Sequence, residues 1–88
     1  MITAKVCFTR QRVFSNHYRP LIKVREDMYN SCELIFINQE STVSGKDVEV
    51  YIEFLCPELV KDYLHVGTKF ELSEGPINVG YGTILYVG

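Results

Sequence analysis

Residues 47–56 read DVEVYIEFLC, and this stretch decides the fold because its apolar and polar side chains alternate. Successive side chains of a β-strand point to opposite faces, so a period of two predicts a strand with one face in a core and one in water. The predicted core face carries Val48, Val50, Ile52, Phe54 and Cys56, and the predicted solvent face carries Asp47, Glu49, Tyr51 and Glu53.

Five further runs have strand character and lie on both sides of this stretch. They cover residues 2–9, 21–24, 32–37, 69–72 and 79–87. Turn-forming residues separate them at 16–20, 27–31, 39–46, 57–67 and 74–78. Only residues 58–64 are suited to a helical turn. Short strands without intervening helices predict an all-β sandwich or barrel, and a six-stranded antiparallel closed barrel is favoured because it leaves no edge strand.

Length and composition limit the classes of protein. The chain has 88 residues, 47% of them hydrophobic and 23% charged, so we expect residues 1–88 to form a single folded domain. No run of about 18 apolar residues and no signal-peptide pattern is present, which predicts no membrane span and a cytoplasmic location.

The charges are divided unevenly along the chain. Residues 1–25 contain six Lys or Arg and no acid, which gives +6. The remaining residues contain three Lys against all 11 acids, which gives −8 and the net charge of −2. An asymmetry of this size favours binding to an oppositely charged partner.

The sequence contains no constellation typical of catalysis. Cys7, Cys32 and Cys56 are odd in number and widely spaced, which predicts free thiols in a reducing compartment. His17 and His65 lie far from any close cysteine pair, so no metal site is expected. No phosphate-binding loop, paired carboxylates or nucleophile elbow is present. We therefore predict a protein that is not an enzyme and that binds no cofactor or nucleotide.

Residues 67–82 read GTKFELSEGPINVGYG, residues 18–20 read YRP, and residues 43–48 and 54–57 read VSGKDV and FLCP. Together these segments resemble the third, C-terminal β-barrel domain of elongation factor Tu, whose pattern over the first of them is approximately GxRFAIREGGRTVGAG. The YRP at 18–20 is similar to the family's GYRP, and residues 43–48 and 54–57 are similar to its MPGD and IHP segments. The resemblance implies a six-stranded antiparallel Greek-key barrel in which Gly80 and Gly82 serve barrel packing.

The resemblance also carries functional implications. In the family this barrel is not catalytic: it packs against the GTPase domain and helps to hold aminoacyl-tRNA and the nucleotide-exchange factor. No GTP-binding segment occurs in the 88 residues, so we expect a stand-alone barrel. The two arginines that flank the family's EGG turn are Ser73 and Ile77 here, and Glu26 and Asp27 replace two threonines. These changes favour a protein partner over tRNA.

Two groups of residues are candidates for binding. The basic segment combines cations with aromatic rings, a combination typical of contact with phosphates and bases; its candidate partner- or RNA-binding residues are Arg10, Arg12, Phe14, Tyr18, Arg19 and Arg25. A plainer interpretation is that these charges pair with acidic neighbouring strands. The alternative acidic partner face consists of Asp47, Glu49, Tyr51 and Glu53.

The leading prediction is a non-catalytic β-barrel binding module that acts through a protein partner, with translation as the context that the resemblance implies. One alternative is an accessory protein that binds tRNA or another RNA through residues 10–25. A second alternative is a small acidic inhibitor or immunity protein that covers the basic active site of a nuclease toxin.

Overall fold

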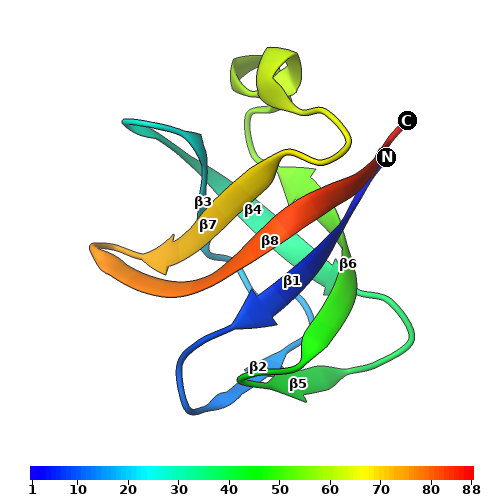
Figure 1. Cartoon of the computed structure of the whole chain (residues 1–88), viewed down its shortest axis with the longest axis vertical. Helices are drawn as coiled ribbons and strands as arrows, with labels where there is room; N and C mark the ends of the chain where they lie inside the picture. The colour runs from blue at the N-terminus through cyan, green and yellow to red at the C-terminus, as the bar shows by residue number, and fades with distance from the viewer.

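Six of the eight strands close into one antiparallel barrel in the computed structural model, which describes residues 1–88 (Figure 1). The order around the barrel is β1-β6-β4-β3-β7-β8, and β8 pairs with β1 to complete it. These strands are β1 (Ile2–Phe8), β3 (Leu21–Arg25), β4 (Met28–Phe36), β6 (Asp47–Phe54), β7 (Lys69–Glu74) and β8 (Ile77–Val87). Because β3, β4 and β6 are consecutive neighbours and β1 lies beside β6, the topology is a Greek key. The predicted six-stranded antiparallel barrel is confirmed.

The core follows the alternation seen in the sequence of β6. Val48, Val50 and Ile52 are buried, whereas Glu49 and Glu53 on the opposite face are exposed. The remaining five barrel strands each add inward-facing apolar side chains to the same core, which is a single cluster of 17 buried residues. The predicted inner and outer faces of β6 are therefore confirmed over this range.

Two short strands lie outside the barrel and were not predicted. β2 (Val13–Ser15) and β5 (Ser41–Val43) pair with each other as a separate two-stranded sheet below one end of the barrel in Figure 1. The prediction of an unstructured turn over residues 39–46 is wrong in its middle, because β5 pairs there with β2. Thr42 and Phe14 point inward from the two strands, so this sheet adds to the core.

Two other predictions about segment ends are also wrong. β4 starts at Met28, inside the predicted turn at 27–31, because the chain reverses directly after Arg25 through Asp27, whose φ is +61°. Cys56 is exposed and lies beyond the end of β6, because the chain leaves the sheet for two 3₁₀ helices, η1 (Pro57–Leu59) and η2 (Lys61–Tyr63). These helices agree with the helical turn predicted within residues 58–64.

Glycines allow the close approach of neighbouring strands on β8. A Cβ atom at Gly82 would lie 2.7 Å from the carbonyl oxygen of Lys5 and 2.8 Å from the Phe70 ring atom Cε1. A Cβ atom at Gly80 would lie 2.8 Å from the carbonyl oxygen of Cys7. Both positions are buried, which supports the prediction that these glycines serve barrel packing.

The two ends of the chain lie side by side at the end of the barrel opposite β2 and β5 (Figure 1). The amino group of Met1 donates a hydrogen bond of 2.7 Å to the carbonyl oxygen of Gly88, and the Gly88 N–H donates one of 3.0 Å to the carbonyl oxygen of Met1. The helices of this fold are too short to cross a membrane.

Candidate binding surfaces

The first part of the basic segment is held by the turn between β7 and β8. Arg10 Nε donates a hydrogen bond of 2.9 Å to the carbonyl oxygen of Asn78. Arg12 forms a bidentate ion pair with Glu74, and the Tyr18 hydroxyl donates a further hydrogen bond to the same carboxylate. The hydrogen bonds from Arg12 and Tyr18 stabilise the charged form of Glu74 and lower the pKa of this carboxyl.

Tyr18 is therefore part of a structural network. Its partial burial and its hydrogen bond to Glu74 both disfavour the phenolate, so the pKa of the Tyr18 hydroxyl is raised well above its ordinary value. The ring of Tyr18 packs edge-on against Phe14, with the ring centroids 5.2 Å apart. Both the hydroxyl and the ring of Tyr18 are thus engaged by other residues of the chain.

Phe14 was predicted as a binding residue, and this prediction is wrong. Its exposed fraction is 1%, and its ring stacks on Phe8 with centroids 3.9 Å apart and planes at 7°. The guanidinium carbon of Arg12 lies 4.5 Å from the centroid of the Phe14 ring and covers it. Phe14 is a core residue of the β2–β5 end and cannot stack on a base.

The last part of the basic segment lies elsewhere on the barrel. Arg19 Nη2 lies 3.8 Å from Glu33 Oε1 on β4. Arg25, at the end of β3, lies against Tyr63 of η2, with its guanidinium carbon 4.7 Å from the ring centroid. The predicted binding residues of the basic segment therefore do not form one surface.

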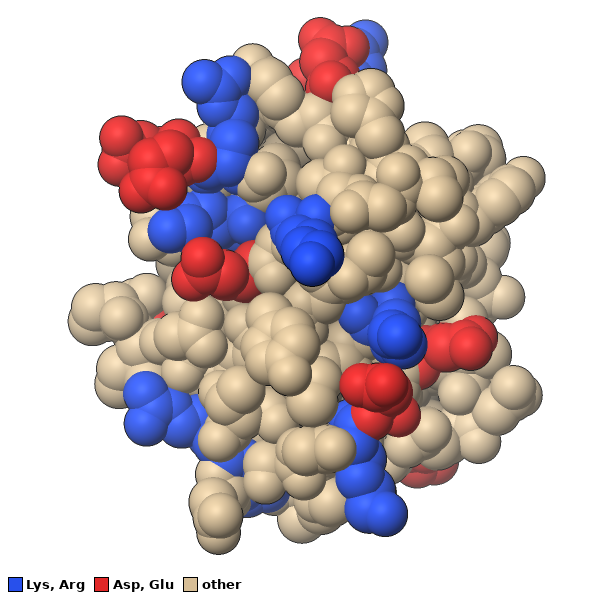
Figure 2. All heavy atoms as spheres, in the orientation of Figure 1, with Lys and Arg blue, Asp and Glu red and all other residues tan.

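The charge asymmetry of the sequence is largely balanced by ion pairs between segments that are far apart in the chain. Four of the six ion pairs join Lys or Arg of residues 1–25 to acids from the rest of the chain: Lys5–Asp47, Arg12–Glu74, Arg19–Glu33 and Lys23–Glu71. Figure 2 shows Lys and Arg next to Asp and Glu over the visible face, without a continuous basic patch. The structure thus agrees with the plainer interpretation of the basic segment.

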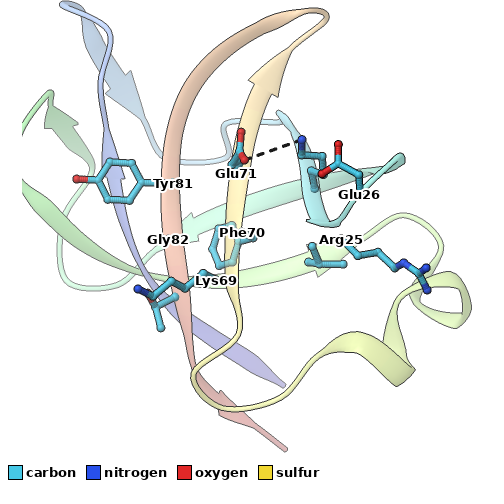
Figure 3. A pocket seen from close by; sticks show the side chains of 10 residues that line it. Arg25, Glu26, Lys69, Phe70, Glu71, Tyr81 and Gly82 are labelled. Carbon is cyan, nitrogen blue, oxygen red and sulfur yellow. Dashed lines mark ion pairs between the residues drawn. The ribbon is translucent and has the colours of Figure 1, made fainter.

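A groove of about 370 Å³ crosses the outside of β3, β7 and β8 (Figure 3). It lies where the pairing of β3 with β7 ends at Lys23–Glu71, and Phe70 and Gly82 contribute to its lining. Lys23 Nζ lies 3.9 Å from Glu71 Oε2. The negative charges of Glu26 and Glu71 raise the pKa of the Lys23 ammonium group. Because its cations and acids are interspersed, this groove is not selective for an anion.

The acidic face of β6 continues onto β4. Glu53 lies directly opposite Glu33 in the β4–β6 pairing. Glu33 is engaged by His17, whose Nδ1 lies 2.5 Å from Oε2, and by Arg19 on its other oxygen. Glu53 and Glu49 are exposed and have no ion-pair partner. Asp47 Oδ2 lies 4.0 Å from Lys5 Nζ. Tyr51 is half-buried, with Thr3 of β1 and Ile35 of β4 as its neighbours on the two adjacent strands.

Two adjacent hollows lie at the end of β6, near the chain termini. One has a volume of about 430 Å³ and is mostly apolar; it is lined by Met1, Ile2, Ile52, Glu53, Phe54, Pro57, Lys61, Leu64, Val87 and Gly88. The other has a volume of about 450 Å³ and is lined by Arg19, Ser31, Cys32, Glu33, Glu53, Phe54 and Leu55. Because Glu53 and Phe54 line both hollows, we treat these residues together and call them the β6-end surface.

The β6-end surface exposes large apolar side chains. Leu55 is 75% exposed, and Leu59 of the neighbouring η1 is 58% exposed. Met1 and Val87 are also exposed in the wall of the first hollow. This surface was not predicted from the sequence, because its walls come from segments that are far apart in the chain. The available signal was Leu55, an apolar residue on the polar side of the alternating pattern of residues 47–56.

The thiols and acids do not assemble into a metal-binding group. Cys32 is buried against the carbonyl oxygen of Pro20, and burial raises the pKa of its thiol to about 12. All three cysteines are free, and no three His, Cys, Asp or Glu side chains come together in a geometry suited to a metal ion.

No protein-family model matches this sequence. The resemblance to the third domain of elongation factor Tu therefore stays a prediction that rests on the quoted segments.

Proposed function

We propose that this chain is a non-catalytic β-barrel module that binds a protein partner through the β6-end surface. The observation that carries the proposal is the pair of adjoining hollows, with Leu55 exposed in the wall of one and Leu59 exposed on η1, whose Pro57 lines the other. Large exposed apolar side chains around such a hollow are typical of a site for protein association. The sequence resemblance adds that a partner from the translation machinery is the first class to test.

The state of the basic residues supports a protein partner over RNA. Arg10, Arg12 and Arg19 are engaged by groups of the chain itself, and Arg25 lies at another part of the barrel. An RNA contact through Arg10, Arg12 or Arg19 would have to compete with these interactions. The free carboxylates of Glu49 and Glu53 favour the inhibitor of a basic enzyme as a second candidate, because both roles would use the same face.

Affinity purification with paired variants tests the proposal. The wild-type chain and the double variant Leu55→Ala/Leu59→Ala are immobilised and exposed to an extract of the cells that produce this protein. Ile77→Ala is the matched control, because Ile77 is an exposed aliphatic residue at the β7–β8 turn. We expect a protein that is retained by the wild type and by Ile77→Ala but lost from the double variant.

The same variants separate the alternatives. Binding of a tRNA mixture that weakens steeply with salt and that depends on Arg10 and Arg12 would replace the proposal by the RNA alternative. Equal retention of every protein by the wild type and the double variant would show that the β6-end surface is not the binding site.

A further inference from the structure

We propose that the β6-end surface recognises a basic segment of its partner in which Lys or Arg stands next to a Leu, Ile or Phe. This inference rests on the proposed function and specifies the chemistry of the partner. The apolar side chain would enter a hollow beside Phe54, and the cation would lie against Glu53.

The charge preference follows from the pairing of β4 and β6. Glu53 and Glu33 stand directly opposite each other, and like charges in this position destabilise a sheet. His17 lies next to one carboxylate oxygen of Glu33, and Arg19 lies next to the other. Glu33 therefore has partners of its own, whereas Glu53 has none. Glu53 remains exposed without a cation. A Lys or Arg from a partner would supply the missing charge.

The other charges that line the two hollows do not change this preference. Arg19 faces Glu33, and Lys61 forms an ion pair of 2.9 Å with Glu58 of the same 3₁₀ region. The amino group of Met1, which also lines the first hollow, donates a hydrogen bond to the carbonyl oxygen of Gly88. All three cations are thus engaged within the chain, which leaves Glu53 as the unmatched charged side chain of the two hollows. Glu49 lies four residues away on the same outer face of β6, directly opposite Lys5 of β1.

The apolar preference follows from the shape of the site. Phe54 is half-buried and lines both hollows, and Leu55 stands beside it in the second. Glu53 also lines both, so an apolar side chain in either hollow brings its sequence neighbours close to this carboxylate. A partner segment with an apolar residue next to a cation therefore matches the site, because it places the apolar side chain in a hollow and the cation at the carboxylate of Glu53.

Selection from a library of random peptides displayed on phage tests this inference with the full chain. We expect the selected peptides to be enriched in Lys or Arg next to Leu, Ile or Phe. A synthetic copy of the best peptide is then titrated by fluorescence anisotropy at low and at physiological salt. We expect Glu53→Lys to weaken its binding by about tenfold or more, because the site's unmatched charge is reversed. The matched control Glu40→Lys, an exposed acid in the loop before β5, should leave binding unchanged.

The variants distinguish failure of this inference from failure of the proposed function. Binding that is lost in Leu55→Ala but kept in Glu53→Lys, or selected peptides without basic residues, would overturn the charge preference and leave the proposed function in place. Peptide binding that is insensitive to Leu55→Ala, or the absence of any selected peptide, would overturn both. Self-association of the chain that depends on Leu55 would assign the surface to a second copy and would also overturn the inference.

Discussion

Replacing Phe14 by alanine tests most directly how this fold uses its basic segment. The ring is buried, stacks on Phe8, and is covered by the guanidinium group of Arg12 and the ring of Tyr18. Truncating such a ring removes its burial and leaves a cavity, which together cost about 3–5 kcal/mol. The aromatic contact with Phe8 contributes about 0.5–1.5 kcal/mol beyond burial. We therefore expect Phe14→Ala to lower the free energy of unfolding by an amount in the upper half of the range of about 3–5 kcal/mol.

The expected loss of unfolding free energy is large in relation to the stability of the whole domain. At about 0.05–0.15 kcal/mol per residue, the stability of an 88-residue domain is on the order of 4–13 kcal/mol. Phe14→Ala would thus remove a third or more of the free energy of unfolding. For a domain of this size, about 1 kcal/mol corresponds to a shift in Tm of about 4–8 °C, so the melting temperature should fall by well over ten degrees.

Urea unfolding followed by far-UV circular dichroism and tyrosine fluorescence measures this change, since the chain has six tyrosines and no tryptophan. Phe14→Leu retains most of the buried volume and should cost less than half as much as Phe14→Ala. The control is Val13→Ala, because the neighbouring Val13 is 62% exposed and should change stability by less than about 0.5 kcal/mol. A loss below about 1 kcal/mol for Phe14→Ala would refute the assignment of Phe14 to the core.

Three further outcomes follow from other parts of the barrel. Gly82→Ala should destabilise the fold by about 1–3 kcal/mol in thermal melts, because the added methyl group would meet the backbone of Lys5; unchanged stability would contradict this packing. Glu74→Gln should lower stability at neutral pH, and the difference from wild type should vanish as the pH falls through the lowered pKa of this carboxyl, since the charged form is what its partners stabilise. A difference that persists in acid would contradict that reasoning. With a thiol reagent at mildly alkaline pH, Cys56 should react in the folded protein, whereas buried Cys32, whose pKa is about 12, should react only after unfolding; labelling of Cys32 in the native state would disprove its burial.

The barrel could be predicted from the sequence because alternation is a local signal. Val48, Val50 and Ile52 lie on one side of β6 in the sequence pattern and in the structure, and a period of two fixes this without knowledge of the partner strands. The three-residue strands β2 and β5 have no such signal, because a period cannot be read over so few positions. Their pairing depends on Phe14 and Thr42 closing one end of the barrel, which is a property of the tertiary structure.

The candidate surfaces were predictable only in part, for a related reason. The acidic outer face of β6 follows from the same alternation and was predicted. The basic segment was grouped because its residues are close in sequence, but the chain reverses direction between β1 and β3. Arg12 therefore reaches the β7–β8 turn, whereas Arg25 lies beside η2. The β6-end surface combines residues that are far apart in the sequence. Ile2, Phe54 and Val87 line one hollow only because the barrel brings β1, β6 and β8 together.

The division of charge along the chain gains a physical meaning from the order of the strands. β1 carries Lys5, and β3 carries Lys23 and Arg25. Each of these strands is flanked by strands with acids: β6 for β1, and β4 and β7 for β3. Antiparallel pairing then places Lys5 near Asp47 and Lys23 near Glu71, at a gain of only about 0–1 kcal/mol for each exposed pair. Such weak pairs contribute little to stability, but they oppose a register in which like charges would face each other. Glu53 is the exception to this pattern, because the strand beside it presents Glu33. Since the paired residues elsewhere in the sheet avoid such an arrangement, the unmatched carboxylate of Glu53 serves no evident need of the barrel, which favours the proposed role of this residue in binding a basic segment.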